Sequence, residues 1–402
     1  MTLLQMALRS LRQHALASTL TTLSLALGAA LTVGVLLLAH RARGAFEETA
    51  LGVQILVAGN KGSRVDALLG TLYHTGRAPG RVALSYVDEL RADPRVDYAI
   101  PVATGDSVGG MPLVGTTGDI LDRFEPRPGE RFRLTGERFD DGPRFAVAGA
   151  ATGLAIGAKF TPSHGGMRGD QTHVHEKFTV VGTLAPTGTA HDRVIWIALD
   201  EFLHLAGHSG LDRGGMGRGE GEVQAVSAAL VKTTSGSPMI IEPLIKQIND
   251  GTEAQAIRPL LVVSELLGLF GTARRILVWV SGLVMLVAIV SVAVSLYNTM
   301  ASRRREFALL RALGAPRSRL LWLVVLEAMA LCLIGSVCGV VIGHGVLTLA
   351  APWVEASAGV RLETGLMLPT EAYFVLAVVG AGSLAGLLPA LRAYRVDVAR
   401  GL

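Results

Sequence analysis

The chain has 402 residues, of which 50% are hydrophobic and only 17% are charged, with a net charge of +4 and a mean hydropathy of +0.45. This composition is too apolar for an ordinary soluble protein and predicts a polytopic membrane protein. Arginines gather at the ends of apolar runs, which argues against a nucleic-acid groove. Both cysteines, Cys332 and Cys338, lie inside one apolar run, so we expect neither a disulfide framework nor a cysteine metal site.

The N-terminal 14 residues combine two arginines with an apolar stripe, which on an α-helix consists of Leu3, Leu4, Ala7, Leu8 and Leu11. The pattern predicts an amphipathic helix at residues 1–14 that lies in the membrane interface. Residues 15–39 follow without a charge and are long enough for a first transmembrane helix. A cleaved signal peptide is the alternative, although its apolar core usually has only about 7–15 residues.

Three more apolar segments predict transmembrane helices at residues 276–297, 321–349 and 372–391. The segment between the first two is basic, because residues 298–319 contain six arginines and one glutamate, whereas residues 350–371 contain three glutamates and one arginine. The positive-inside rule therefore places the loop 298–320 in the cytoplasm and the loop 350–371 outside. The N-terminus and the tail 392–402 then both face the cytoplasm.

The same topology places residues 40–253 outside the membrane, where they form a domain large enough for its own core. Strands are predicted by the β-branched and aromatic segments 53–58, 98–102, 178–181 and 194–198. Together with the helices described next, they predict an α+β fold.

Two helix starts are recognisable in this domain. Ser85 with Asp88 predicts a capping box that opens a helix ending near Ala92. Ser237-Pro238 predicts the start of a second helix that ends before Gly251. The segment 207–222 contains seven glycines and predicts a surface loop, and residues 254–275 predict a stalk helix that continues into the second span.

The transmembrane segments contain small residues at helical spacing, which predict close helix packing or a subunit interface at Gly28, Gly335, Gly339, Gly343, Gly382 and Gly386. Glu327 lies about two turns into the third span, where a carboxylate costs about 2.5–3.5 kcal/mol, less near the interface. We expect it to snorkel or to pair with a loop arginine rather than to move an ion. His344 is expected to be a hydrogen-bonded packing residue.

No nucleotide-binding loop, nucleophile elbow or zinc-protease motif is present, so any ATP-driven role needs a partner chain. Histidines are concentrated in one part of the outer domain, and strand alternation would put His173 and His175 on one face. Two interpretations stay open. The first is a polar histidine-rich hairpin, and the second is a metal site, for zinc, formed by His164, His173, His175 and His191.

Nearly the whole chain resembles the FtsX/MacB-like permeases of ABC transporters, the mechanotransmission type that includes lipoprotein-release and macrolide-export systems. The most specific similarity is SRRREFALLRALGAPRSRLLWLVVLEAMALCLIGSVCGVVIG, residues 302–343. ALRSLRQHALASTLTTLSLALGAAL resembles the family's opening helix and first span, and LPALRAYRVDVARGL its tail, with Val398 where a proline is usual. IGAKF and KFTVVGTLAPTGTAHDRVIWIALDEF resemble the periplasmic core domain, whereas the sequence between Phe160 and Lys177 departs from the family pattern.

The resemblance implies a non-catalytic permease subunit in a bacterial inner membrane. Two permease chains, identical or paralogous, would pair with two copies of a cytoplasmic ATPase that binds ATP and magnesium. The segment 298–320 would be the coupling helix, with a charged and an apolar surface for the ATPase contributed by Arg303, Arg304, Arg305, Glu306, Leu309, Leu310, Arg311, Leu313 and Gly314. The outer domain would act on a substrate or binding protein outside the bilayer.

Three alternatives stay open. The chain could be a transmembrane regulator of an outer partner, such as a cell-wall hydrolase, that transports nothing. It could also be a metal-responsive membrane module that uses the histidines. For the basic loop alone, binding of anionic lipid is the simpler interpretation.

Overall fold

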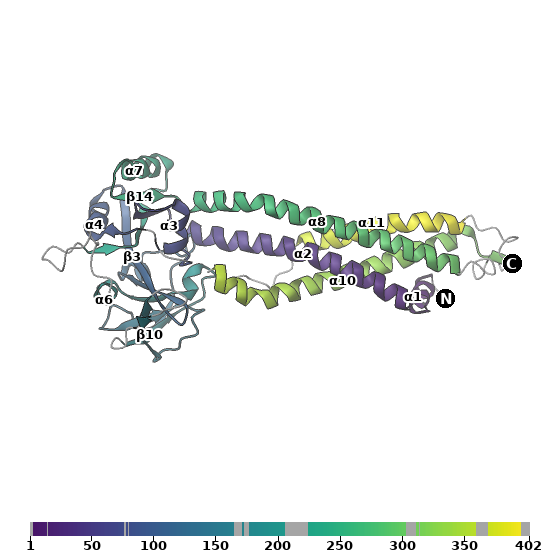
Figure 1. The fold of residues 1–402 in the computed structure, drawn as a ribbon, viewed down its shortest axis with the longest axis horizontal. Coiled ribbons are helices and arrows are strands. Elements are labelled where there is room, and N and C mark those ends of the chain that lie inside the picture. Colours follow the sequence, from purple (N-terminus) through teal and green to yellow (C-terminus); the bar gives the residue numbers. More distant parts are fainter. Residues whose placement is uncertain are drawn as a thin grey trace. The chain divides into compact units, whose positions relative to one another are not determined.

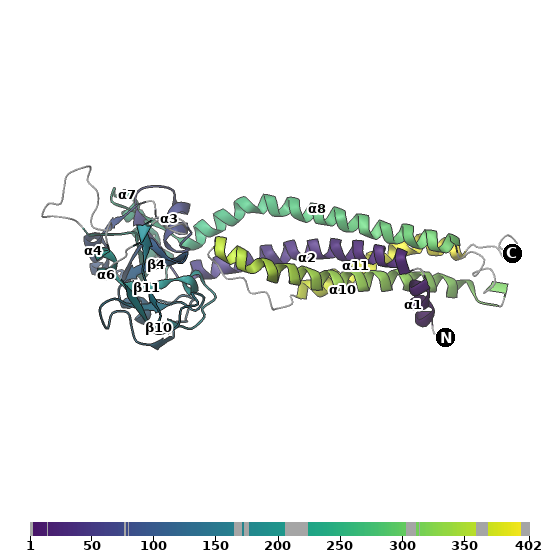
Figure 2. The ribbon, with the colours of Figure 1, turned by 60° about the horizontal axis from the view of Figure 1, so that its bottom comes forward.

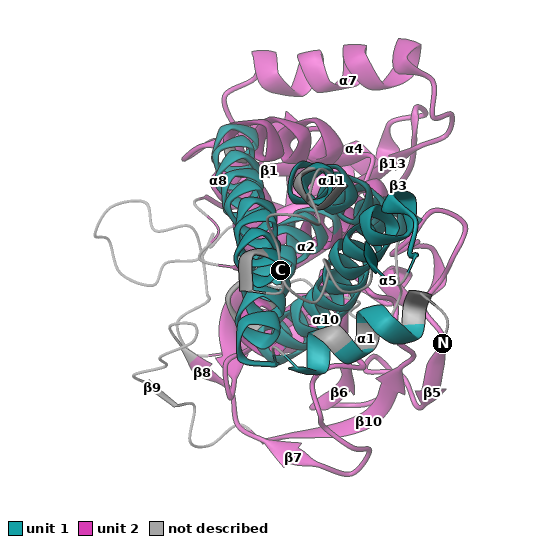
Figure 3. Ribbon diagram, turned by 90° about the vertical axis from the view of Figure 1, so that its right-hand side faces the viewer, with its two compact units in different colours: residues 1–40, 271–351, 363–402 teal, residues 41–270, 352–362 magenta. Residues whose placement is uncertain are grey.

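The computed structural model describes residues 3–13, 15–75, 78, 80–164, 171–172, 177–205, 224–302, 311–312, 314–358 and 369–394. They divide into two compact units, which Figure 3 shows in different colours. The helical unit comprises Met1–His40, Gly271–Ala351 and Glu363–Leu402, and the α+β unit comprises Arg41–Phe270 and Pro352–Leu362. The α+β unit begins at Arg41, and the bounds 40–253 of the outer domain stay a prediction.

A mixed β-sheet forms the centre of the α+β unit. Its main path runs through β14 (Ala254–Ile257), β1 (Ile55–Gly59), β13 (Ala228–Thr233), β3 (Val96–Val108), β4 (Met111–Thr116), β11 (Ile195–Ala198), β6 (Phe145–Ala148), β10 (Phe178–Leu184) and β5 (Leu134–Gly136). Most neighbours are antiparallel, but β11 pairs with β4 and β10 pairs with β6 in parallel. The short strands β7 (Lys159–Phe160), β8 (Ser163–His164) and β9 (Gln171–Thr172) attach beside this path, and β2 (Val82–Ala83) pairs separately with β12 (Ala225–Val226).

Both faces of this sheet are buried. In β1, Leu56 and Ala58 enter one hydrophobic cluster, whereas Ile55 and Val57 enter the other, as strand alternation requires. The first face is covered by α3 (Arg64–Thr71) and α5 (Asp119–Asp122), and the second by α4 (Leu84–Ala92), α6 (Leu199–His204) and α7 (Pro238–Asp250). Figure 1 shows α3 and α4 on opposite sides of the sheet. The predicted α+β class is therefore confirmed.

The predicted capping box at Ser85 and Asp88 is wrong. Helix α4 begins at Leu84, and its N-cap Ala83 makes no side-chain hydrogen bond. The reason is tertiary, because β2 pairs with β12 and the Leu84 amide donates to the Gln224 carbonyl, which fixes where the helix starts.

The structure has its capping box at α3 instead. There the Asp66 amide donates to Ser63 Oγ at 3.1 Å, and the Ser63 amide donates to Asp66 Oδ2 at 3.4 Å. The prediction for α7 is confirmed, since Ser237 Oγ accepts from the Met239 amide and Gly251 follows the helix.

The predicted stalk begins later than the sequence indicated. Residues 254–257 form strand β14 beside β1, and the helix α8 (Pro259–Ser302) starts at a proline. Proline lacks an amide hydrogen and favours the first turn of a helix, while the residue before it tends to be extended. Likewise the predicted outer loop 350–371 is shorter, because helix α10 (Arg317–Ala358) continues to Ala358.

Within the described part of the chain, four helices are long and apolar enough to cross a membrane, as predicted. The candidate spans are Ala15–Leu51, which forms α2, Gly271–Met300 in α8, Arg317–Val354 in α10 and Pro369–Leu391 in α11 (Pro369–Tyr394). Figures 1 and 2 show these helices side by side, with the short α1 (Leu3–Gln13) at one end. Many leucines on α2 and α8 are exposed, as a lipid-facing surface requires.

Two histidines are enclosed in the core of the α+β unit. The rings of His74 and His191 lie 6.3 Å apart between centroids, and His191 also contacts Phe124 and Trp196. Among the described residues, neither imidazole has a hydrogen-bond partner. Burial lowers the pKa of His74 from 6.5 to about 3, with smaller effects of His191 and Arg193, and burial lowers the pKa of His191 from 6.5 to about 4.

These shifts predict an acid-sensitive domain. Both histidines are neutral when folded, so between pH 6.5 and about 4 the unfolded chain binds protons that the folded chain does not. Stability should fall as the pH drops through this window, by up to about 1.4 kcal/mol per pH unit for each histidine. Thermal unfolding of the detergent-solubilised full chain, followed by tryptophan fluorescence from pH 7.5 to 4.5, measures the slope.

The control is His204→Gln, because His204 lies on the exposed end of α6. His191→Phe should flatten the acid limb, while His204→Gln should leave it unchanged. An identical slope in His191→Phe and the wild type would contradict the interpretation.

Candidate functional site

The predicted coupling segment 298–320 includes the last turn of α8, which ends at Ser302, and the first turn of α10, which begins at Arg317. Its residues Arg303–Leu310 and Leu313 lie outside the described residues, so their roles stay predictions. Arg311 and Gly314 are described, and the Gly314 amide donates to the Arg311 carbonyl at 3.0 Å. Gly314 has a φ of 90°, a left-handed conformation that suits glycine after a helical turn.

The glycines of α10 lie against α2 within the helical unit. A Cβ atom on Gly335 would lie 2.7 Å from the Leu25 Cβ atom, and one on Gly339 would overlap the Ala29 Cβ atom. A Cβ atom on Gly343 would come within 3.2 Å of the Ala30 carbonyl oxygen. Successive turns of α10 therefore approach the α2 backbone closely, which small residues alone permit.

The glycines of α11 are placed against α10 in the same way. A Cβ atom on Gly382 would overlap the Cys332 sulfur, and one on Gly386 would lie 2.7 Å from the Ala328 Cβ atom. Gly28 of α2 is less tightly placed, since its Cβ position is 3.6 Å or more from Val284 and Met285 of α8. These six positions thus link α2, α8, α10 and α11 within one chain.

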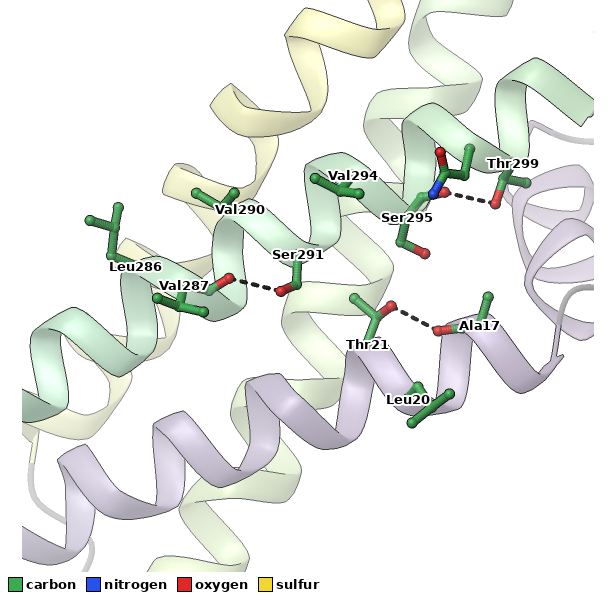
Figure 4. Close-up of a pocket in the computed structure, with 11 residues that line it drawn as sticks. Ala17, Leu20, Thr21, Leu286, Val287, Val290, Ser291, Val294, Ser295 and Thr299 are labelled. Carbon is green, nitrogen blue, oxygen red and sulfur yellow. Dashed lines mark hydrogen bonds between the residues drawn. The ribbon is translucent and has the colours of Figure 1, made fainter.

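An open groove of about 540 Å³ lies between α2 and α8 (Figure 4). Its lining consists of Ala17, Leu20, Thr21, Leu286, Val287, Val290, Ser291, Val294, Ser295, Asn298 and Thr299. Several hydroxyls donate to carbonyls of their own helix, for example Thr21 to Ala17 at 2.7 Å and Ser291 to Val287 at 2.9 Å. Because these donors are satisfied locally, the groove can face hydrocarbon at little cost.

Two carboxylates among the described residues of the helical unit, Glu327 and Glu371, are buried. Glu327 is 3% exposed in α10. His344 of α10 and Glu371 in the first turn of α11 form a hydrogen bond of 3.0 Å between Nε2 and Oε2. His344 is thus hydrogen-bonded, as expected from the sequence.

In the α+β unit, the ends of two long helices are part of the core. The Tyr73 hydroxyl donates to the Phe46 carbonyl of α2 at 2.5 Å, and Arg127 pairs with Glu48 of α2 at 2.6 Å. Val262 and Val263 near the start of α8 are buried in the hydrophobic cluster on the same face of the sheet. Residues 41–51 and 259–270 are therefore fixed to this unit by packing and hydrogen bonds.

The predicted zinc ligands are only partly described. His164 lies in β8, opposite Asp106 of β3, whereas His191 is enclosed in the aromatic cluster. His173 and His175 lie outside the described residues. Within the part of the chain that the structure describes, no three metal-binding side chains come together. The zinc site stays a prediction.

Some residues of these sites were missed by sequence reasoning. His74 is separated from His191 by more than 100 positions, and nothing in its local sequence indicates burial. Gly339 contacts Ala26 and Ala29, for which the only signal in the sequence is the general abundance of alanine in the first span. No local signal identifies which small residue meets which.

One span before a large α+β insertion and three spans after it define a class of multi-pass membrane protein. Residues 18–239 match the MacB-like periplasmic core domain, and residues 278–398 match the FtsX-like permease C-terminal family. The chain therefore belongs to the FtsX/MacB-like family of ABC transporter permeases. Among curated proteins, the sequence finds no significant match.

Solved structures include distant neighbours of this chain. The periplasmic region of MacB from Actinobacillus actinomycetemcomitans is 12% identical, with a TM-score of 0.34, over 54% of this chain and 94% of that chain. The extracellular domain of the noncanonic ABC-type transporter YknZ from Gram-positive bacteria is 13% identical, with a TM-score of 0.29, over 50% of this chain and 98% of that chain.

Because α10 lies so close to α2, the effect of a larger side chain on thermal stability should depend on its position in α10. Gly339→Leu should destabilise the helical unit by about 1–3 kcal/mol, because its side chain must displace the α2 backbone. Gly345→Leu is the matched control on the same helix, since no atom lies within 4 Å of its Cβ position. Thermal melts of both purified variants in detergent make the comparison, and equal melting temperatures would rule out the tight contact.

Proposed function

We propose that this chain is the permease subunit of an ABC transporter, which couples ATP binding and hydrolysis by a separate cytoplasmic ATPase to movement of its α+β domain. The domain would lie outside a bacterial inner membrane and act there on a substrate or partner. Family membership supports the general role, because FtsX/MacB-like chains are ABC transporter permeases that work with a cytoplasmic ATPase. Members of this family are typically non-catalytic subunits.

The observation that supports coupling most directly is the length of α2 and α8. With a rise of about 1.5 Å per residue, the 37 residues of α2 extend about 55 Å and the 44 residues of α8 about 66 Å. The hydrocarbon core of a bilayer is only about 30 Å thick. Each helix therefore combines a membrane-span length with a segment packed into the α+β core, and an unbroken helix can transmit displacement along its axis.

The input to this movement would be the coupling segment 298–320. Arg303, Arg304 and Arg305 supply positive charge for an ATPase groove, and Leu309 with Leu310 supplies apolar contact. ATP-driven closure of two ATPase subunits would displace this segment in each of two paired permease chains, and α8 and α10 begin or end beside it. A two-state arrangement of the paired spans is then the switching element.

The coupling segment generates a direct test. Arg304→Glu with Arg305→Glu, or Leu309→Pro, should abolish stimulated ATP hydrolysis and weaken co-purification with the ATPase encoded nearest to this gene. Membrane insertion should be unchanged, because the spans are not altered. Arg64→Glu on the exposed start of α3 is the control for a charge change in the α+β unit. Wild-type association and stimulation in the coupling variants would refute the assignment.

Reconstitution into proteoliposomes with the ATPase would distinguish a transporter from a regulatory permease. ATP-dependent movement or extraction of a substrate supports a transporter. Activation of an outer partner without any such movement supports a regulatory permease of the same fold.

A further inference from the structure

The short helix α1 is more than the membrane-surface helix that its sequence pattern predicts. Its Ala7 is completely buried within the helical unit. Figures 2 and 3 show α1 running across the end of the helical bundle rather than along it. At Ala7 the apolar stripe of α1 therefore faces protein, and the location of α1 in the membrane interface stays a prediction.

Ala7 forms a buried cluster with Leu320 and Leu323 of α10. Met300, in the last turn of α8, packs against the same cluster. Met300 and Leu320 lie near the two ends of the coupling segment 298–320, the first in the last turn of α8 and the second in the first turn of α10. Residues at both ends of that segment therefore pack in or against the cluster that contains Ala7 of α1.

A second contact fixes the orientation of α1. Leu11 lies one turn after Ala7 on the same helical face and packs against the main core of the helical unit. That core contains Leu25 of α2 and Leu296 of α8. Because α1 ends at Gln13 and α2 begins at Ala15, one residue joins α1 to the first span.

We propose that α1 is a brace that holds the two ends of the coupling segment at a fixed spacing and links them to the first span, with Ala7 as the positioning residue. This inference rests on the proposed function, since it assumes that the ATPase acts on the coupling segment. The proposal gives α1 a role in the same movement as α8. Through the contact of α1 with α10, the first span, α2, would also respond to the ATPase.

The size of the Ala7 side chain provides the test. In the full chain co-expressed with the ATPase encoded nearest to its gene, Ala7→Phe should still co-purify with the ATPase but reduce stimulated hydrolysis by about fivefold to tenfold. Adding Leu323→Ala should restore stimulation, because it makes room for the larger ring. Gln13→Phe, at the exposed end of α1, is the control and should behave as the wild type.

A cross-link between α1 and α10 tests the contact directly. With Cys332 and Cys338 replaced by alanine, Ala7→Cys with Leu323→Cys should form a disulfide in membranes under mild oxidation. A fixed brace predicts that the cross-linked chain keeps stimulated hydrolysis near the wild-type level. Stimulation that is lost on oxidation and recovered with reductant would overturn the brace.

The remaining outcomes distinguish failure of the brace proposal from failure of the permease assignment. Wild-type stimulation in Ala7→Phe, or absence of the disulfide, overturns the brace and leaves the permease assignment intact. Failure of the wild-type chain to bind or stimulate the ATPase overturns both. If Ala7→Phe does not fold, Ala7→Val replaces it, and a folded Ala7→Val with unchanged stimulation likewise overturns the brace.

Discussion

Close backbone contact between α2 and α10 is the constraint on which the helical unit depends. Lipid tails are as apolar as leucine, so burial alone does not hold transmembrane helices together, and dispersion between closely approaching backbones must do so. Gly339 packs against Ala29, with Gly335 and Gly343 one turn to either side. Since α10 also packs through Cys332 on Gly382 of α11, the same helix positions its neighbours on two sides. A larger side chain at these glycines is therefore expected to disturb the packing of the whole helical unit.

The α+β unit solves a different problem, because it has to hold the ends of two long helices. Its sheet is buried on both faces, and one face receives the end of α2 and the start of α8. Arg127 with Glu48 and the Tyr73 hydroxyl with the Phe46 carbonyl add polar contacts between this unit and the last turns of α2. The helix ends are therefore part of the domain rather than flexible connections to it, as the proposed coupling requires.

The four spans, the α+β class and the family could all be predicted from the sequence, because hydropathy over about 20 residues, strand composition and the arginine-rich motif are local signals. The boundaries were less predictable. Ser85 resembles an N-cap, yet pairing of β2 with β12 starts the helix earlier, and residues 254–257 became a strand because β1 offered a free edge. In each case a partner distant in sequence overrode the local preference.

The sequence by itself determined how many times the chain can cross a membrane and where its basic loop falls, since both depend on runs of neighbouring residues. Only the tertiary structure decided which glycine meets which alanine, that Ala7 faces Leu320 and Leu323 rather than lipid, and that His191 is enclosed with His74. The reason is physical. Periodicity defines the apolar face of an element, but the element that covers this face comes from elsewhere in the chain, often more than 100 residues away.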